Sequence, residues 1–389
     1  MTLTLASAEA SRPAPSPAPI LAATVAPQGA WPQLPAGTRW LQVQRRERLC
    51  ADIVALTLVD PSGVPLPDWT AGAHVDLLLP LDGPAAPPRA RSYSLCHRPG
   101  ERGHYQIAVQ RERAGRGGSA WVHEHLHEGA WVPVRPPRNL FTLRPAPHVL
   151  LLAGGIGLTP LLAMAEALWA EGRSFALQVA VRQRTRLPFA ARLAQAPWAR
   201  HVQVWADDEG AALDLPAQLA AQPAGTLVAT CGPAGFMAAV QRAAQQAGWA
   251  PERVLLEHFA APPAAAVDRP ATVSAVAPEA APDFAPDAAP AQVLWAPTGQ
   301  CLALPPQASV AQVLRAAGVA LDLSCEQGIC GQCCLQVLDG QAEHRDLVYG
   351  PHEHTVERRF TPCCSRPAAG AAGPLVLAPL GWAQAEGSA

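Results

Sequence analysis

The sequence predicts a multidomain protein in which an all-β barrel or sandwich comes first, an α/β unit with a parallel sheet follows, and a separate cysteine-rich unit comes last. Three observations predict this order. Residues 38–144 hold short strand patterns cut by Pro, Gly and Asp, residues 145–260 alternate strand and helix patterns, and an Ala/Pro stretch at 261–290 sets residues 291–389 apart. A chain of 389 residues has room for two to four such domains.

The composition is that of an ordinary soluble globular protein, with 49% hydrophobic residues and a formal net charge of -2. This balance gives no sign of a nucleic acid partner. There is no apolar run of membrane-spanning length, and no basic region precedes the short apolar stretch near the N-terminus. We therefore expect no membrane anchor and no secretion signal, and the expected location is the cytoplasm.

Two segments are rich in Ala and Pro and lack periodic apolar residues. Residues 1–37 cannot bury enough apolar surface to offset the entropy of ordering, so we expect a disordered tail. Residues 261–290 add a few acidic groups to the same composition and are expected to form a semi-rigid linker.

Strands are expected in both of the first two units. In residues 38–144 the alternating or β-branched segments lie at 40–43, 53–59, 74–79 and 105–109. In residues 145–260 a buried strand at 148–153 leads through a glycine turn into a helix at 159–170. Further strands are expected at 177–181, 202–205 and 226–231. Strands that alternate with helices indicate a parallel sheet.

Two glycine turns lie where strands of this sheet lead into helices. Thr159 is the expected N-cap of the first helix, with Pro160 at its first helical position. Glycines let the backbone approach a pyrophosphate, and a helix N-terminus attracts it, although many such turns need glycine only for packing. Two turns at the carboxyl edge of one sheet indicate a dinucleotide crevice. The residues expected at this crevice are Gly154, Gly155, Gly157, Thr159, Cys231, Gly232 and Pro233.

A third candidate site lies upstream, in the β unit. An arginine, two hydroxyls and an aromatic ring share a strand, and a glycine-rich loop follows before a helical segment. These groups could hold a flavin, because the arginine and the loop amides suit a phosphate and the ring packs on an aromatic system. The alternative is a solvated strand and a plain turn. The residues concerned are Arg91, Ser92, Tyr93, Ser94, Gly117, Gly118 and Ser119.

Cys325, Cys330 and Cys333 have the C-x4-C-x2-C spacing that holds a plant-type 2Fe-2S cluster together with a distant fourth thiolate. The adjacent Cys363 and Cys364 are the candidates for that fourth ligand, and we choose Cys363. Zinc sites usually come as two C-x2-C pairs and disulfides suit small secreted chains, so both alternatives fit less well.

The remaining cysteines are expected to be structural. Cys334 and Cys364 each follow a proposed ligand and are interpreted as buried apolar fillers, or as alternate donors during cluster assembly. Cys50, Cys96 and Cys301 are scattered along the chain and are interpreted as ordinary core thiols.

From residue 38 to the end the chain resembles the phthalate dioxygenase reductase and vanillate demethylase reductase family. The resemblance lies in Arg91-Ser-Tyr-Ser-Leu, Gly115-Arg-Gly-Gly-Ser, Pro137-Arg-Asn-Leu-Phe-Thr-Leu, Gly154-Gly-Ile-Gly-Leu-Thr-Pro, Cys231-Gly-Pro, the cysteine run, His344-Arg-Asp and Cys363-Cys-Ser-Arg. It implies an antiparallel β-barrel flavin domain, an α/β Rossmann-like nucleotide domain and an α+β β-grasp 2Fe-2S ferredoxin domain.

The resemblance also assigns residues. It implies that Arg91, Tyr93, Ser94 and the Gly117, Gly118 and Ser119 loop bind FMN, and that Gly155, Thr159, Cys231, Gly232 and Pro233 line the nicotinamide nucleotide site. It places the aromatic ring of Phe259 near the flavin and makes Cys363 the fourth cluster ligand. From the residues alone, Phe259 is an aromatic at a strand end, which is more often a core residue.

One departure from the family concerns the coenzyme. The family often shows an arginine followed by an acidic residue after the second strand of the sheet, whereas this chain has Arg182, Arg184 and Arg186 there. An acidic group that binds the ribose hydroxyls favours NADH, and arginines accommodate a 2′-phosphate. NADH is thus the expected coenzyme with NADPH possible, and a solvated basic loop is the alternative role of these arginines.

These features together predict an electron relay. Nicotinamide gives two electrons as hydride and a 2Fe-2S cluster accepts one, so FMN is expected between them, with Thr159 and Cys231 beside the nicotinamide. The resemblance implies that the acceptor is a Rieske-type terminal oxygenase, and we expect a monomer. The alternatives are a self-contained flavin or ferric reductase and a non-catalytic iron-sulfur redox-sensing protein.

Overall fold

The computed structural model describes residues 34–83, 86–260 and 291–382. The linker expected at 261–290 lies outside these residues, as does the tail expected at 1–37 except for 34–37. The described strands form a six-stranded sheet, two five-stranded sheets and a two-stranded one. Among the described helices, none is both long enough and apolar enough to cross a bilayer.

The six-stranded sheet is antiparallel and closes on itself, which agrees with the expected barrel. Its strand order is β4-β3-β6-β1-β2-β5, and a bridge between Leu95 and Ile107 joins the end of β4 to β5. Helix α1 (Gly118–His125) follows the glycine-rich loop. The strands are β1 (Arg39–Arg48), β2 (Ile53–Val59), β3 (His74–Leu79), β4 (Arg89–Ser94), β5 (Tyr105–Gln110) and β6 (Trp131–Val134).

The second sheet is parallel, with the order β11-β10-β7-β8-β9. The chain order reverses between β7 and β10, so the crevice at their carboxyl ends lies where a doubly wound sheet binds ligands. Its strands are β7 (Val149–Gly154), β8 (Phe175–Val181), β9 (Val202–Ala206), β10 (Leu227–Cys231) and β11 (Val254–Glu257). The helices are α2 (Leu158–Ala170), α3 (Ala190–Gln195), α4 (Leu215–Ala220) and α5 (Ala234–Gln246), with single 3-10 turns at Gly155–Gly157, Arg184–Arg186, Ala199–His201, Asp207–Glu209 and Pro251–Arg253.

The start of α2 differs from the prediction. The residues Gly155–Gly157 form a 3-10 turn, and α2 begins at Leu158 with Gly157 in the N-cap position and no side-chain cap. Thr159 therefore lies inside the helix, where its hydroxyl donates to the carbonyl of Ile156 at 3.1 Å. The prediction of Thr159 as N-cap is wrong because the 3-10 turn ends the strand and starts the helical path earlier.

The third sheet is mixed, with the order β13-β12-β18-β14-β16, and α6 packs on it through Val310 and Leu314. Ser309 caps α6 in a capping box with Gln312. The elements are β12 (Gln292–Trp295), β13 (Gln300–Ala303), α6 (Val310–Ala316), β14 (Leu335–Asp339), β15 (Ala342–Glu343), α7 (Pro351–Thr355), β16 (Arg359–Phe360), β17 (Arg366–Pro367) and β18 (Leu375–Pro379). The expectation that Cys301 is a core thiol is wrong, because β13 is an edge strand and exposes it.

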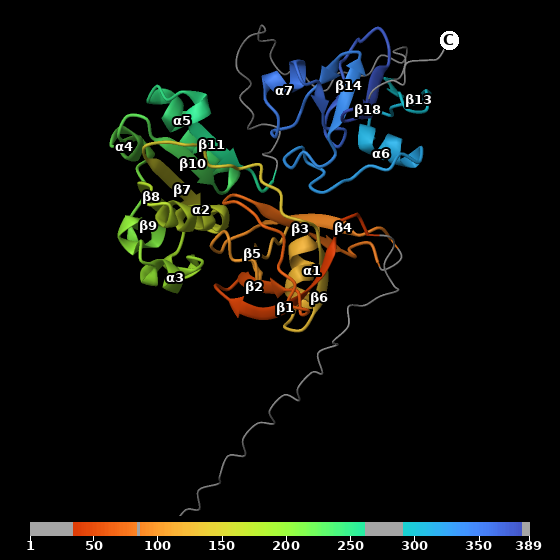
Figure 1. Cartoon of the computed structure of the whole chain (residues 1–389). Helices are drawn as coiled ribbons and strands as arrows, with labels where there is room; N and C mark the ends of the chain where they lie inside the picture. The colour runs from red at the N-terminus through yellow and green to blue at the C-terminus, as the bar shows by residue number, and fades with distance from the viewer. Residues whose placement is uncertain (1–33, 84–85, 261–290, 383–389) are drawn as a thin grey trace, which may run out of the picture.

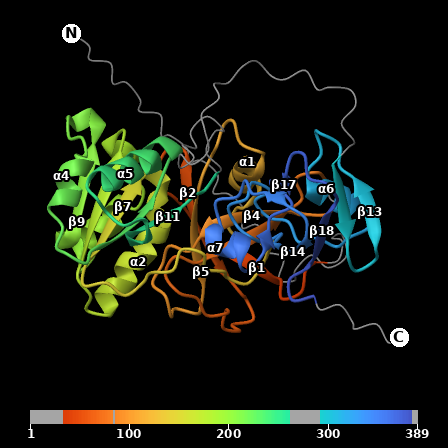
Figure 2. The same cartoon turned by 90° about the horizontal axis from the view of Figure 1, so that it is seen from above.

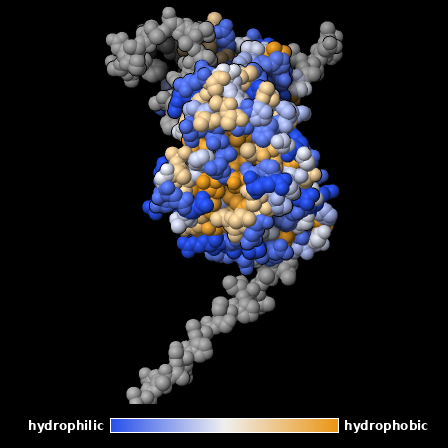
Figure 3. Space-filling model, turned by 90° about the vertical axis from the view of Figure 1, so that its left-hand side faces the viewer, coloured by the Kyte–Doolittle hydropathy of each residue, from blue (hydrophilic) through white to orange (hydrophobic). Residues whose placement is uncertain are grey.

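The barrel lies at the centre of the molecule. The parallel sheet with its helices lies to one side of it, and the mixed sheet lies against it from another direction (Figures 1 and 2). Seen from the side of α3, α4 and α5, the surface is mostly hydrophilic, with apolar side chains gathered near its middle (Figure 3).

Candidate functional site

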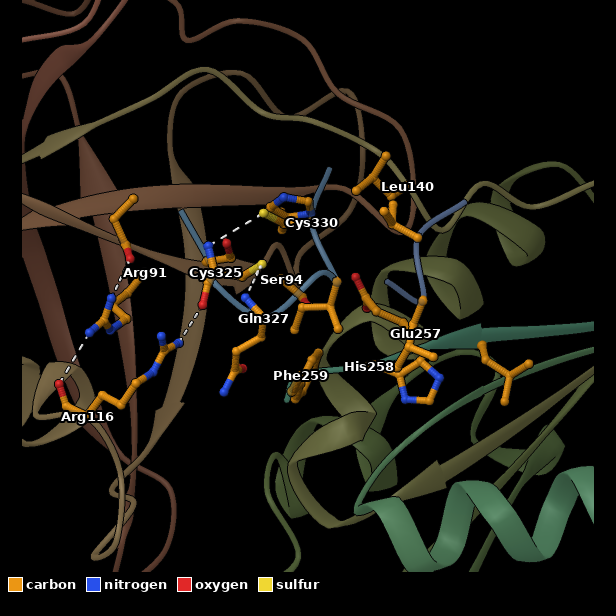
Figure 4. A pocket seen from close by; sticks show the side chains of 17 residues that line it. Arg91, Ser94, Arg116, Leu140, Glu257, His258, Phe259, Cys325, Gln327 and Cys330 are labelled. Carbon is orange, nitrogen blue, oxygen red and sulfur yellow. Dashed lines mark hydrogen bonds between the residues drawn. The ribbon is translucent and has the colours of Figure 1, made fainter. Parts of the chain in front are cut away.

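A cavity of about 210 Å³ lies where the three units meet. The barrel contributes an arginine-rich end, β11 contributes its last two residues and the two residues that follow it, and the loop before β14 contributes two cysteines (Figure 4). The residues that line the cavity are His74, Ala90, Arg91, Ser92, Ser94, Arg116, Leu140, Leu256, Glu257, His258, Phe259, Cys325, Gln327, Ile329, Cys330, Leu347 and Val348.

Two guanidinium groups stand together at one end of the cavity. Arg91 donates to the carbonyl of Arg116 at 3.2 Å, and burial followed by the charge of Arg116 lowers the pKa of Arg91. A Cβ at Gly118 would lie 2.7 Å from Arg91 Cγ, so the start of α1 packs tightly under this side chain. Paired cations beside a helix start fit an anionic phosphate.

A buried ionic network adjoins the cavity wall at His74 and Ser92. The carboxylate of Asp76, in the middle of β3, is fully buried and accepts hydrogen bonds from Arg138 at 2.8 Å and from Ser92 at 2.6 Å. Burial alone would raise the pKa of Asp76, but the Arg138 charge and the Ser92 hydrogen bond outweigh it and hold the pKa below its ordinary value. Asp76 is therefore ionised at neutral pH.

His74 lies beside this network, two residues before Asp76 on β3 and therefore on the same face of the sheet. Burial, and then the charge of Arg138, lowers the pKa of His74 to about 4, so the imidazole is neutral. Its Nε2 is buried and has no hydrogen-bond partner among the described residues. His74 itself lines the cavity, and an unpaired buried polar atom on a cavity residue fits a site that receives a polar ligand.

The loop that carries Cys325, Cys330 and Cys333 has the shape that a cluster requires. Gly328 and Gly331 both have positive φ, at +73° and +62°. A Cβ at Gly328 would meet Cys364 Sγ at 2.5 Å. The backbone N–H of Gln327 donates to Cys325 Sγ at 3.3 Å, as expected for a loop whose amides face sulfur atoms.

The thiols of this loop meet those of the late cysteine pair. The Cys330 thiol lies close enough to that of Cys325 to raise its own pKa, and the pKa of the Cys363 thiol is perturbed by the neighbouring thiols of Cys325, Cys333 and Cys364. Cys364 also lies against Thr361, at 3.3 Å from its hydroxyl. A set of four converging thiols, Cys325, Cys330, Cys333 and Cys363, fits a 2Fe-2S cluster by its donor chemistry.

The nucleotide crevice adjoins the cavity. Cys231 ends β10 next to Ala153 of β7, and a Cβ at Gly157 would overlap the carbonyl of Cys231, so the two glycine turns touch. Thr159 and Cys231 are both buried. Burial, and then the charge of Glu257, raises the pKa of the Cys231 thiol, which is therefore neutral.

Glu257 is a cavity residue to which the sequence patterns assigned no role. It pairs with Cys231 across β10 and β11, and its Oε2 has no partner among the described residues. Burial raises the pKa of Glu257 to about 8, against a hydrogen bond with Ser94 that lowers it. A strongly perturbed pKa in a cavity marks Glu257 as a candidate functional residue.

The predicted site residues occupy different places around the cavity. Arg91, Ser92, Ser94, Phe259, Cys325 and Cys330 line it directly. Tyr93 packs on the hydrophobic core of the barrel, Gly117 has a φ of +80°, and Ser119 accepts a hydrogen bond from the amide of Glu112. The residues at the glycine turns, Gly154, Gly155, Gly232 and Pro233, lie at the carboxyl ends of β7 and β10.

Arg184 lies farther away, after β8. Its backbone N–H donates to the carboxylate of Asp208 at 3.0 Å, and its guanidinium faces Glu209 at 3.9 Å. The acidic group near this loop therefore comes from the turn after β9. Sequence patterns after β8 could not reveal it, since 24 residues separate Arg184 from Asp208.

The chain is similar to several known proteins. Residues 293–368 match the model of a 2Fe-2S iron-sulfur cluster binding domain. The chain is 40% identical over 318 residues to the vanillate O-demethylase oxidoreductase of Pseudomonas sp. (strain HR199 / DSM 7063), which covers 81% of this chain and 92% of that protein.

Two solved structures are also similar. Phthalate dioxygenase reductase, described as a modular structure for electron transfer from pyridine nucleotides to [2Fe-2S], superposes with a TM-score of 0.61 at 32% identity, over 88% of this chain and 97% of that one. An intact type IV self-sufficient cytochrome P450 monooxygenase superposes with a TM-score of 0.71 at 36% identity over 88% of this chain, which spans 40% of that monooxygenase.

The fold, the match to the cluster-binding domain and these relatives together define the cofactor set as flavin, NAD(H) and a 2Fe-2S cluster. The chain belongs to the phthalate dioxygenase reductase and vanillate demethylase reductase family of electron-transfer oxidoreductases.

Proposed function

We propose that the chain is the reductase component of a Rieske-type oxygenase system and passes electrons from NADH through FMN and a 2Fe-2S cluster to a terminal oxygenase. The observation that carries this proposal is the shared cavity, which is lined by the barrel, by the end of β11 and by two cysteines of the cluster loop. A bound flavin supplies the exchange between a two-electron hydride donor and a one-electron acceptor. The protein supplies position and electrostatics.

In this proposal the arginine end of the cavity binds the flavin phosphate. Arg91 and Arg116 face it with their guanidinium groups, and the Gly117, Gly118 and Ser119 loop offers amides at the start of α1. Ser92 and Ser94 lie farther along the same wall, and Tyr93 supports the strand from the core side. The choice of FMN over FAD follows from the family resemblance.

The nucleotide crevice would hold the coenzyme. The turns at Gly154, Gly155 and Gly157 and at Gly232 and Pro233 would take the pyrophosphate, and Thr159 and Cys231 would lie beside the nicotinamide. Glu257 holds a proton at its carboxyl group next to Ser94 and Cys231. Phe259 has 43% of its surface exposed at the cavity mouth, where its ring would exclude water from the site.

We propose Cys325, Cys330, Cys333 and Cys363 as cluster ligands. Cys325 and Cys330 line the same cavity as the proposed flavin residues, so the ligand loop comes close to the donor without an intervening element. Short distances are what one-electron transfer requires, so this contact supports a relay inside one polypeptide.

We propose NADH as coenzyme, with Arg184 at the ribose end. Asp208 accepts from the Arg184 N–H and Glu209 faces its guanidinium, so acidic groups surround this arginine. That charge pattern disfavours a 2′-phosphate. The ratio of kcat/KM for NADH to that for NADPH tests this point, and a preference for NADPH would overturn it.

We also propose which class of protein accepts the electrons, and in which oligomeric state and cell compartment the chain works. The vanillate O-demethylase relative supports an oxygenase that acts on an aromatic acid or methyl ether, whereas the similarity to part of a cytochrome P450 monooxygenase supports a haem acceptor as the second candidate. We further propose a monomer in the cytoplasm, with domains at 38–144, 145–260 and 291–389.

One experiment separates the two acceptors. The purified chain, reduced by NADH without oxygen, is mixed with a Rieske-type oxygenase or with a haem monooxygenase from the same organism. We expect rapid reduction of the Rieske centre and slow reduction of the haem. Electron paramagnetic resonance monitors the reduction of the Rieske centre. Reduction of the haem alone would overturn the Rieske assignment and leave the reductase function intact.

A further inference from the structure

Two carbonyl groups of the cluster loop accept hydrogen bonds from arginines of the barrel. Arg138 Nη1 donates to the carbonyl of Cys330 at 3.2 Å, and Arg116 Nη2 donates to the carbonyl of Cys325 at 2.7 Å. Both cysteines are proposed cluster ligands. An effect of these arginines on the reduction potential of the cluster therefore rests on the proposed function. Cations from one unit thus reach the metal-binding loop of another.

Arg138 is held rigidly in this position. Its Nη2 donates to Asp76 at 2.8 Å, so the guanidinium joins a buried carboxylate to the ligand carbonyl. Asp76 also accepts from Ser324, the residue before Cys325, at 3.1 Å. The Arg138 side chain is 28% exposed and the Asp76 side chain is fully buried, so solvent screens their charges weakly.

We propose that Arg138 raises the reduction potential of the cluster while the last unit lies against the barrel. Reduction adds one negative charge at the cluster loop, and a cation close to a ligand stabilises the reduced form. Arg138 acts through the backbone of Cys330 and is a positioning residue, not a catalytic one. The docked arrangement therefore favours arrival of the electron, and separation of the units makes the cluster a stronger donor.

The network predicts that two single substitutions shift the reduction potential of the cluster in opposite directions. Arg138→Gln removes the cation and leaves the negative charge of Asp76 nearby, so the potential falls. Asp76→Asn removes the anion and leaves the cation, so the potential rises. Mere loosening of the contact would move both potentials in the same direction.

The chain offers a matched control for Arg138. Arg39 lies in the same barrel, donates through Nη1 to the carbonyl of Pro65 at 2.9 Å and through Nη2 to Asp60 at 3.0 Å, and is 29% exposed. It therefore joins a carbonyl to a carboxylate as Arg138 does, but neither partner belongs to residues 291–382. Arg39→Gln is expected to leave the cluster potential unchanged.

The test is a redox titration of the full-length protein. The electron paramagnetic resonance signal of the reduced cluster monitors the titration, and iron content is measured on each sample. We expect a lower potential for Arg138→Gln, a higher one for Asp76→Asn, and a value near wild type for Arg138→Lys, which keeps the charge. An unchanged potential in Arg138→Gln, or shifts of the same sign in Arg138→Gln and Asp76→Asn, overturns the inference. If Arg138→Gln loses iron, the other two variants decide the question. A higher potential in Asp76→Asn and a near-wild-type potential in Arg138→Lys support the inference, and a potential in Asp76→Asn that does not rise overturns it. A wild-type protein without a cluster would instead overturn the proposed function.

Discussion

Ser324 donates a hydrogen bond to the buried carboxylate of Asp76 at 3.1 Å, across a separation of 248 residues. The same hydroxyl lies 3.2 Å from that of Ser92, on the strand proposed to hold the flavin. Ser324 immediately precedes Cys325, so one side chain joins the cluster loop to strands β3 and β4 of the barrel. The contact is polar, as expected for an interface that opens and closes.

Ser324→Ala is expected to weaken docking of the cluster loop. A hydrogen bond to a charged group contributes about 1.5–3 kcal/mol, which corresponds to roughly a tenfold or larger loss of the docked population. Stopped-flow absorbance should show slower electron transfer from flavin to cluster and an unchanged rate of flavin reduction by NADH. Ser62→Ala is the control, because Ser62 donates to Asp60 at 2.5 Å on the barrel alone. Equal rates in both variants would contradict a docking role for Ser324.

Cys330→Ser is expected to abolish the cluster. A serine hydroxyl replaces a thiolate poorly as an iron ligand, so iron content should fall to near zero. Flavin content and the rate of flavin reduction by NADH should stay within about twofold of wild type, since hydride transfer does not pass through the loop. Cys301→Ser is the control, because that thiol is exposed on β13. A folded Cys330→Ser variant with full iron content would refute the ligand assignment.

Gly157→Ala is expected to disrupt the nucleotide crevice. Its new Cβ would overlap the backbone of Cys231 and Gly232, which cannot move independently of β10. We expect a loss of about 1–3 kcal/mol in unfolding free energy and weaker NADH binding in calorimetry. Gly235→Ala, in α5, meets nothing within 4 Å and should be neutral or slightly stabilising. Unchanged NADH affinity in Gly157→Ala would show that the coenzyme lies elsewhere.

Much of the fold followed from local patterns. The expected strands at 53–59 and 74–79 coincide with β2 and β3, because short runs of apolar and β-branched residues bounded by turns mark them clearly. The strand β6 was not predicted, since it has four residues and includes Pro133. The start of α2 was predicted wrongly, because a 3-10 turn of glycines has no distinct sequence signal.

The contacts between units could not be predicted in the same way. Arg135 pairs with Asp322, and Arg138 bonds to Cys330, over separations of 187 and 192 residues, and no local spacing encodes such pairs. The sequence nevertheless contained a sign that Asp76 takes part in a buried contact. A carboxylate in the middle of an apolar strand requires a buried partner, and that requirement marks the position even when its partners are unknown.

Glu257 is expected to make the stability of the protein depend on pH. Its folded pKa of about 8 lies above the ordinary value of 4.5, because burial disfavours the charged form; Ser94 and Cys231 are its polar neighbours. Between these two values the unfolded chain loses this proton while the folded chain keeps it. The contribution of Glu257 is therefore full below about pH 4.5 and is lost as the pH rises through about 8. Relative to wild type, Glu257→Gln should gain thermal stability as the pH rises from 5 to 8, by up to about 1.4 kcal/mol per pH unit.

Infrared spectroscopy tests the same proton directly. At pH 7 the difference spectrum between wild type and Glu257→Gln should contain the carbonyl stretch of a protonated carboxyl group, and this band should disappear well above the pKa of about 8. Glu252→Gln is the control, because Glu252 is exposed on the turn before β11 and does not line the cavity. If the band is missing at pH 7 in the folded wild type, Glu257 is ionised there, and the cavity contains a carboxylate that some other group must neutralise.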